Sequence, residues 1–148
     1  MSKAQPGCLR AYNRARTHFT AAVLGSALAV GVVVPSSAQN FSQASALEVK
    51  LVDFRFIPPT IHFRAGKPVI LRLQNTAEQD HEFAAPQFFA AATIRGGDAK
   101  RINKEGEAEV AAGARVDIGL VPKAGTYHLQ CNKPGHAEAG MQGSIVVN

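Results

Sequence analysis

The chain has 148 residues, of which 46% are hydrophobic and 18% are charged, and this length suits one domain with a modest core rather than two domains. The formal net charge is +5. Four of the 16 basic residues and none of the 11 acidic residues lie in positions 1–38, so the remainder carries twelve cations against eleven anions. This balance, with the cations scattered, excludes a nucleic-acid-binding surface of clustered positive charge.

The N-terminal segment has the features of a secretory signal peptide in their usual order. Four basic residues lie between positions 3 and 16, an apolar run covers 21–34, and small residues follow at 36–38. Secretory signal peptides have this succession of charged, apolar and small-residue regions. The apolar run is short for a membrane span. We expect cleavage after Ala38 and a periplasmic protein, with retention of the segment as a membrane anchor as the alternative.

The rest of the chain predicts one all-β domain. Residues 39–46 are rich in Gln, Ser and Ala and predict a flexible leader before a domain over 47–148. Alternating apolar residues then predict a series of short strands, at 47–56, 60–63, 69–75, 115–121, 126–131 and 143–147. Between them, 88–92 predicts a short helical turn and 100–109 a charged loop. About seven to eight strands with few helical signals predict an antiparallel β-sandwich or barrel.

After removal of positions 1–38, the chain contains a single cysteine, Cys131, and a single methionine, Met141. A lone cysteine in an exported chain is buried and inert, paired with another molecule, reactive, or a metal ligand. The segment 131–141 reads CNKPGHAEAGM, so His136 lies midway between the two sulfur residues and Pro and Gly residues supply the bends. Thiolate, thioether and imidazole donors together favour copper.

A blue-copper site requires a second histidine, since two imidazoles and one thiolate form its trigonal plane, with a weak axial methionine. His62 and His128 alternate with apolar residues in predicted strands, so they are expected on the outer face. His81 follows a polar loop at a strand edge and is favoured. Zinc also accepts two histidines and one cysteine, but the methionine favours copper.

Two stretches resemble the small bacterial cupredoxins, the superfamily of plastocyanin and azurin. The first, 52–83, contains DFRFIP, AGKPV and DHEF, and the second, 125–141, contains GTYHLQC, PGH and GM. The resemblance covers nearly all of 47–148. It implies a Greek-key β-sandwich that binds one copper ion per chain through four ligands, His81, Cys131, His136 and Met141.

The resemblance also identifies one departure from the family pattern. The spacing of the C-terminal ligands is longer than in plastocyanin and is similar to that in rusticyanin. Plastocyanin-like proteins usually carry Asn directly after the first histidine, where it helps fix the ligand loops, whereas this chain has Glu82. The Glu82 carboxylate is an alternative axial ligand.

These features predict an exported, monomeric one-electron carrier with a type 1 copper site. Its partner is expected to be a redox protein or a copper acceptor, and neither nucleic acid nor, after cleavage, a membrane is expected as a partner. The sequence shows no acid–base pair typical of catalysis, so we do not expect an enzyme. Copper buffering or delivery is the alternative function. A metal-free interaction module is the least favoured, because all four donors are present.

Overall fold

The computed structural model describes residues 40–148. A 3-10 helix covers Phe41–Gln43, and strand β1 (Ser45–Val52) begins two residues before the domain boundary predicted at 47. The end of the predicted leader is therefore part of the folded domain. The predicted signal peptide, 1–38, lies outside the described residues. Among residues 40–148 no helix has the length and apolar character needed to cross a membrane.

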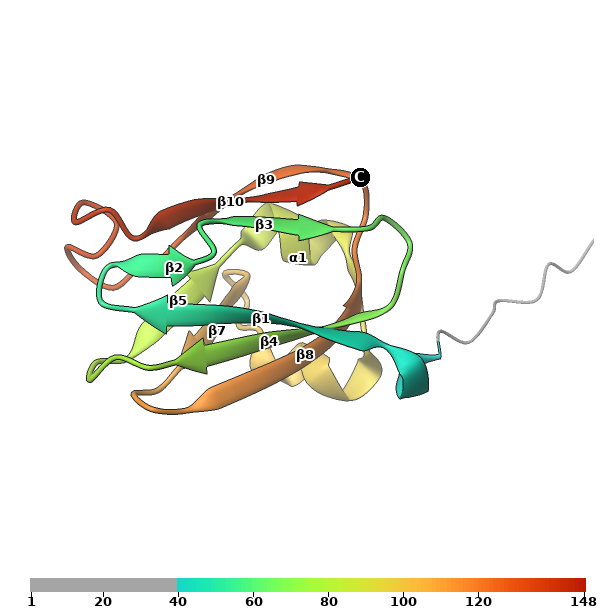
Figure 1. Cartoon of the computed structure of the whole chain (residues 1–148), viewed down its shortest axis with the longest axis horizontal. Helices are drawn as coiled ribbons and strands as arrows, with labels where there is room; N and C mark the ends of the chain where they lie inside the picture. The colour runs from blue at the N-terminus through green and yellow to red at the C-terminus, as the bar shows by residue number, and fades with distance from the viewer. Residues whose placement is uncertain (1–39) are drawn as a thin grey trace, which may run out of the picture. The chain divides into compact units, whose positions relative to one another are not determined.

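The domain is built from two five-stranded sheets (Figure 1). The first sheet has the order β2 (Arg55–Ile57), β1, β4 (Val69–Asn75), β8 (Arg115–Val121) and β6 (Thr93–Ile94). The second has the order β3 (Thr60–Phe63), β10 (Gln142–Val147), β9 (Gly125–Gln130), β5 (His81–Ala84) and β7 (Glu107–Val110). The pairs β1–β4 and β3–β10 are parallel, and the other pairs are antiparallel. The all-β sandwich is confirmed, with ten strands where seven to eight were predicted.

Three segments differ from the predicted strand pattern, and one of them is the short strand β6, which was not predicted. The strand predicted over 47–56 is interrupted by a two-residue turn, Asp53-Phe54, after which β2 pairs back onto β1. The loop predicted over 100–109 ends in edge strand β7, which follows the 3-10 helix Gly96–Arg101. The two glutamates of β7 face outward while Ala108 and Val110 are fully buried. The strand was missed because its charged residues obscured a short alternation.

The core lies between the sheets and follows from alternation along the strands. Buried leucine, isoleucine and valine side chains of β1, β4, β8 and β10 face one another across it. Each fully buried aliphatic side chain stabilises the fold by about 1.5–3 kcal/mol. Helix α1 (Pro86–Ala91) adds Phe88 and Phe89, both buried, close to the predicted helical turn at 88–92.

The sandwich brings the candidate ligand segments to one end. Figure 1 shows the loop between β9 and β10 at the same end as the β1–β2 turn. Strand β5 lies beside β9, pairing Ala84 with Gln130, the residue before Cys131. His81, which is remote in sequence from Cys131 and His136, therefore comes from a segment that neighbours theirs.

Candidate metal centre

The loop between β9 and β10 holds three of the predicted donors and is closed by its own backbone. The Cys131 amide donates to the Met141 carbonyl at 3.0 Å, and the Met141 amide donates to the His136 carbonyl at 2.9 Å. Gly135 and Gly140 have φ of 79° and 103°, in the left-handed region that glycine adopts without strain. The bends predicted from these glycines are confirmed, and they return the chain past each donor.

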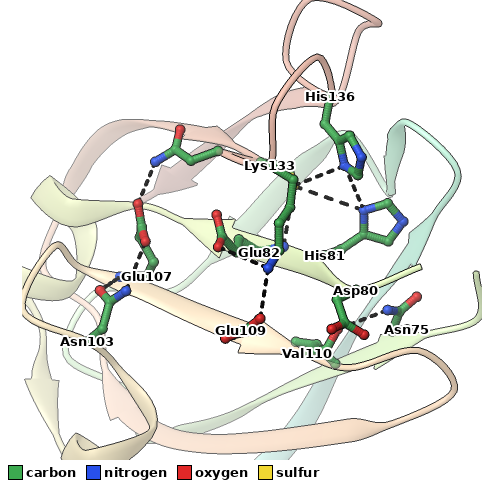
Figure 2. Close-up of polar contacts among 12 residues, drawn as sticks. Asn75, Asp80, His81, Glu82, Asn103, Glu107, Glu109, Val110, Lys133 and His136 are labelled. Carbon is green, nitrogen blue, oxygen red and sulfur yellow. Dashed lines mark hydrogen bonds and ion pairs between the residues drawn. The ribbon is translucent and has the colours of Figure 1, made fainter.

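His81, the first residue of β5, comes from a loop that is organised by a buried amide. The Asn75 Nδ2 group donates to the Gln79 carbonyl at 2.8 Å and to the Val110 carbonyl at 2.9 Å. The Asn75 Oδ1 atom accepts from the Ala77 amide at 2.9 Å. Figure 2 shows Asn75 beside Val110, close to His81. The amide therefore sets the path by which the chain enters β5.

Sequence reasoning missed this role of Asn75. The sequence did contain a signal for it. Asn75 falls in the same alternating series along β4 as three buried apolar residues, Val69, Leu71 and Leu73, so it points into the core. A fully buried polar side chain requires hydrogen-bond partners, so its position pointed to an organised loop.

Three of the four predicted ligands converge on one point. The Nδ1 atoms of His81 and His136 are 3.2 Å apart, and the Cys131 Sγ atom lies 3.5 Å from the His136 Nδ1 and 4.0 Å from the His81 Nδ1. With metal bonds of roughly 2.0–2.3 Å, a trigonal ion would separate three such donors by roughly 3.5–3.8 Å. The triangle therefore fits one small ion held by two nitrogens and one thiolate.

The three donors are buried, and burial sets the protonation states from which they would bind a cation. His81, Cys131 and His136 are 1%, 0% and 8% exposed. Burial lowers the pKa of His81, and the nearby His136 lowers it further, so this imidazole is held in the neutral form that a ligand requires. Burial raises the pKa of the Cys131 thiol, so metal binding must displace a proton there.

Met141 is the remaining predicted ligand, and His62 and His128 lie on the outer face, as predicted. Met141 is fully buried and joined through its backbone to both Cys131 and His136. Its thioether stays the predicted axial donor. His62 and His128 are exposed, and the His128 Nε2 atom lies 3.0 Å from the Gln130 Oε1 atom. Neither belongs to the cluster of donors within residues 40–148.

The Glu82 carboxylate faces a lysine of the ligand loop and is not part of the donor cluster. Its Oε1 atom lies 3.5 Å from the Lys133 Nζ atom, which is also 2.8 Å from a Glu109 oxygen. The hydrogen bond that the Lys133 ammonium donates to Glu109 raises the pKa of Lys133, and the Glu82 carboxylate adds to the effect. The alternative in which Glu82 is the axial ligand is therefore not favoured by the structure.

An aromatic residue that sequence reasoning did not consider covers His136. The Phe54 ring packs edge-on against the His136 ring, with centroids 5.2 Å apart, and Phe54 is 40% exposed. Phe54 has a φ of 56°, which is unfavourable for a residue with a large side chain. Backbone strain of this kind gathers at functional sites, where the surrounding structure holds it in place.

Comparison with known proteins agrees with this site. Residues 25–147 match the cupredoxin-like domain family. The copper-resistant cuproprotein CopI of Rubrivivax gelatinosus is 37% identical over 98 aligned positions, and the match covers 63% of this chain and 59% of the relative. The chain thus spans about three fifths of the length of this curated relative.

Solved structures show the same fold at low identity. Auracyanin B has a TM-score of 0.53 and 22% identity, over 74% of this chain and 92% of that protein. Auracyanin from Roseiflexus castenholzii has a TM-score of 0.53 and 16% identity, over 71% and 97% of the two chains. The multicopper oxidase mgLAC has a TM-score of 0.52 and 17% identity, over 71% of this chain and 39% of the oxidase. The matched family, together with the converging His81, Cys131 and His136 donors, shows that this chain belongs to the cupredoxin-like family and has a site for one copper ion.

Proposed function

We propose that this protein is a one-electron carrier that holds copper through His81, Cys131, His136 and Met141. The observation that carries the proposal is the convergence of three buried donors, supplied by two segments that the sandwich holds together. Copper bound there supplies a couple between Cu(I) and Cu(II). The donor set suits both states, because imidazole binds either ion and sulfur stabilises the reduced one.

The scaffold supports electron transfer because the ligands have little freedom to move. His81 is paired with Val110 in the β5–β7 ladder, and Cys131 directly follows β9. The hydrogen bonds within the loop link Cys131, Met141 and His136 to one another. Ligands held in this way change position little when the ion changes charge, so the reorganisation cost of electron transfer stays small.

His136 is the proposed exit for the electron. It is the most exposed of the three clustered donors, at 8%, and the half-exposed Phe54 ring covers it. A redox partner would therefore approach the end of the sandwich that carries the β9–β10 loop. We further propose that the protein acts as a periplasmic monomer and has no catalytic activity of its own. The likeness to a multicopper oxidase concerns the fold, over 39% of that enzyme.

Copper buffering or delivery is the second candidate, and one comparison favours it. The relative at 37% identity is named a copper-resistant cuproprotein. A site that binds Cu(I) well also serves as a reservoir, so the donor set is compatible with either function.

The copper site is tested by adding Cu(II) to the purified protein and recording visible and EPR spectra. We expect an intense thiolate-to-copper absorption band that Cys131→Ser abolishes. His128→Ala is the matched control, because this exposed histidine lies outside the cluster and its variant should keep the band. A colourless wild-type protein that binds no copper would refute the assignment.

A second experiment separates the two candidate functions. Loaded protein is taken through repeated reduction by ascorbate and oxidation by ferricyanide, and its copper content is measured after each cycle. A carrier retains its copper and its band through many cycles. Rapid loss of Cu(I) to a copper-free acceptor protein, together with slow electron exchange, would instead establish delivery.

A further inference from the structure

The Glu82 backbone contacts the Cys131 sulfur, and Lys133 lies two residues beyond Cys131 in the ligand loop. The Glu82 amide donates to the Cys131 Sγ atom at 3.4 Å. The backbones of Glu82 and Lys133 lower the pKa of the thiol, against the larger effect of burial. Hydrogen bonds to a ligating sulfur tune a copper site, because they withdraw charge from the thiolate. Glu82 lies on β5 and Lys133 lies on the ligand loop.

The side chains of the same two residues are joined. The Lys133 ammonium lies between two carboxylates, 3.5 Å from the Glu82 Oε1 atom and 2.8 Å from the Glu109 Oε1 atom. Figure 2 shows Lys133 reaching from the ligand loop toward both glutamates. The Glu82 and Lys133 side chains are only 17% and 28% exposed, so solvent screens their interaction less than it screens an ordinary surface pair.

The lysine also relieves a repulsion in the sheet. Glu82 and Glu109 are direct cross-strand partners in the β5–β7 ladder. Like charges placed directly opposite each other destabilise a strand pair, so these carboxylates need a cation between them. Removing the lysine would leave two anions facing each other one residue away from His81.

We propose that Lys133, held between Glu82 and Glu109, clamps the ligand loop to β5 and so keeps the Glu82 amide on the Cys131 sulfur. Glu82 and Lys133 are therefore positioning residues of the copper site. The ion pair links the two ligand segments at the residue that directly follows His81. This inference depends on copper binding alone and holds whether the protein carries electrons or delivers copper.

Glu109→Gln is the matched control for Glu82→Gln. Each variant removes one carboxylate from the same ammonium and changes the net charge equally, but only Glu82 carries an amide that donates to the sulfur. The double variant E82K/K133E tests for rescue. It moves the ammonium to β5, between Glu109 and the carboxylate introduced on the loop, and keeps the total charge unchanged.

Two readouts are measured on each variant. Hydrogen exchange of the amide at position 82 is followed by NMR in the copper-free protein, and Cu(I) affinity is measured by competition with a chelator. We expect Glu82→Gln and Lys133→Met to speed exchange of this amide about tenfold and to weaken copper affinity about tenfold, the lower range for residues that orient metal ligands. Glu109→Gln should change each readout less than about threefold, the range of an exposed ion pair.

The double variant should return both readouts to within about threefold of the wild type, as expected when an ion pair of this kind is restored. Equal effects of Glu82→Gln and Glu109→Gln would overturn the proposal. Unchanged copper affinity in Glu82→Gln would also overturn it. The same holds if the double variant folds but is as impaired in both readouts as Glu82→Gln. The exchange measurement requires no copper, so its result is distinguishable from a failure of the proposed function.

Discussion

Replacing Asn75 by Asp tests how the loop before His81 is held. The substitution keeps the shape of the side chain and the Oδ1 acceptor for Ala77, but it exchanges the Nδ2 donor for a second oxygen. That oxygen would face the carbonyls of Gln79 and Val110, now 2.8 and 2.9 Å from the amide nitrogen. No cavity is created, so the effect isolates the two donated hydrogen bonds.

The magnitude follows from these contacts. Two lost hydrogen bonds cost about 1 kcal/mol each, and buried carbonyls left without a donor add roughly 1 kcal/mol or more. We therefore expect the free energy of unfolding to fall by about 3 kcal/mol at neutral pH. Burial against two carbonyls raises the pKa of the new carboxyl in the folded protein above its unfolded value of about 3.9.

The sign of the pH dependence follows from this raised pKa. Between the two pKa values the folded protein binds more protons than the unfolded chain, so stability falls as the pH rises. The loss should begin near pH 4 and grow by about 1.4 kcal/mol per pH unit until the folded protein also ionises, roughly two units higher.

Urea denaturation of the copper-free protein, followed by circular dichroism between pH 4 and pH 8, measures the effect. Gln74→Glu is the control, because it makes the same chemical change at a half-buried neighbour whose amide makes only weak contacts, at 3.2 and 3.3 Å. The control should lose less than about 1 kcal/mol, one ordinary hydrogen bond, at any pH in this range. The reasoning would be refuted if Asn75→Asp lowered the free energy of unfolding no more than the control does. It would also be refuted if the loss of stability did not depend on pH.

Three further substitutions test other parts of the structure. Burial alone would raise the pKa of Asp98, but two neighbouring arginines and the Gly119 amide lower it below its ordinary value. Asp98→Asn should therefore cost about 2 kcal/mol at neutral pH, and the difference from wild type in urea denaturation should shrink as the pH falls below about 4. Gly119→Ala should lower the melting temperature, because the added Cβ would lie 2.9 Å from the Arg95 Nε atom and 3.1 Å from the Asp98 Oδ2 atom. An unchanged melting temperature would show that these two side chains move aside at no cost in stability. Phe54→Gly removes the contact with His136 but relieves about 1 kcal/mol of strain from the left-handed backbone conformation. The free energy of unfolding should therefore stay within about 1 kcal/mol of the wild-type value. A larger loss of stability would show that the contact outweighs the strain.

The structure changes the interpretation of Glu82. From the sequence, this residue was a departure from the family pattern and a competing axial ligand. In the fold, its amide faces the Cys131 sulfur and its carboxylate faces Lys133. Sequence reasoning does not give this arrangement, because it depends on the pairing of β5 with β7 and on the return of the ligand loop.

The sequence by itself determined the donor chemistry and most of the strands. Cys131, His136 and Met141 are close along the chain, so local spacing and two glycine bends were enough to identify their loop. Alternation singled out His81 by placing His62 and His128 on the outer face, where both are exposed. These signals are local, because each depends only on the two-residue period of a strand or on the geometry of a single turn.

Only the tertiary structure decided how the donors meet and what surrounds them. The approach of His81 to Cys131 requires β5 to lie beside β9, a pairing across 46 positions from Ala84 to Gln130. The turn at Asp53-Phe54 and the edge strand β7 were hidden, because one is a left-handed turn without glycine and the other has charged residues at alternate positions. The cover over His136 and the ion pairs of Lys133 arise from contacts between segments remote in sequence, which no local pattern encodes.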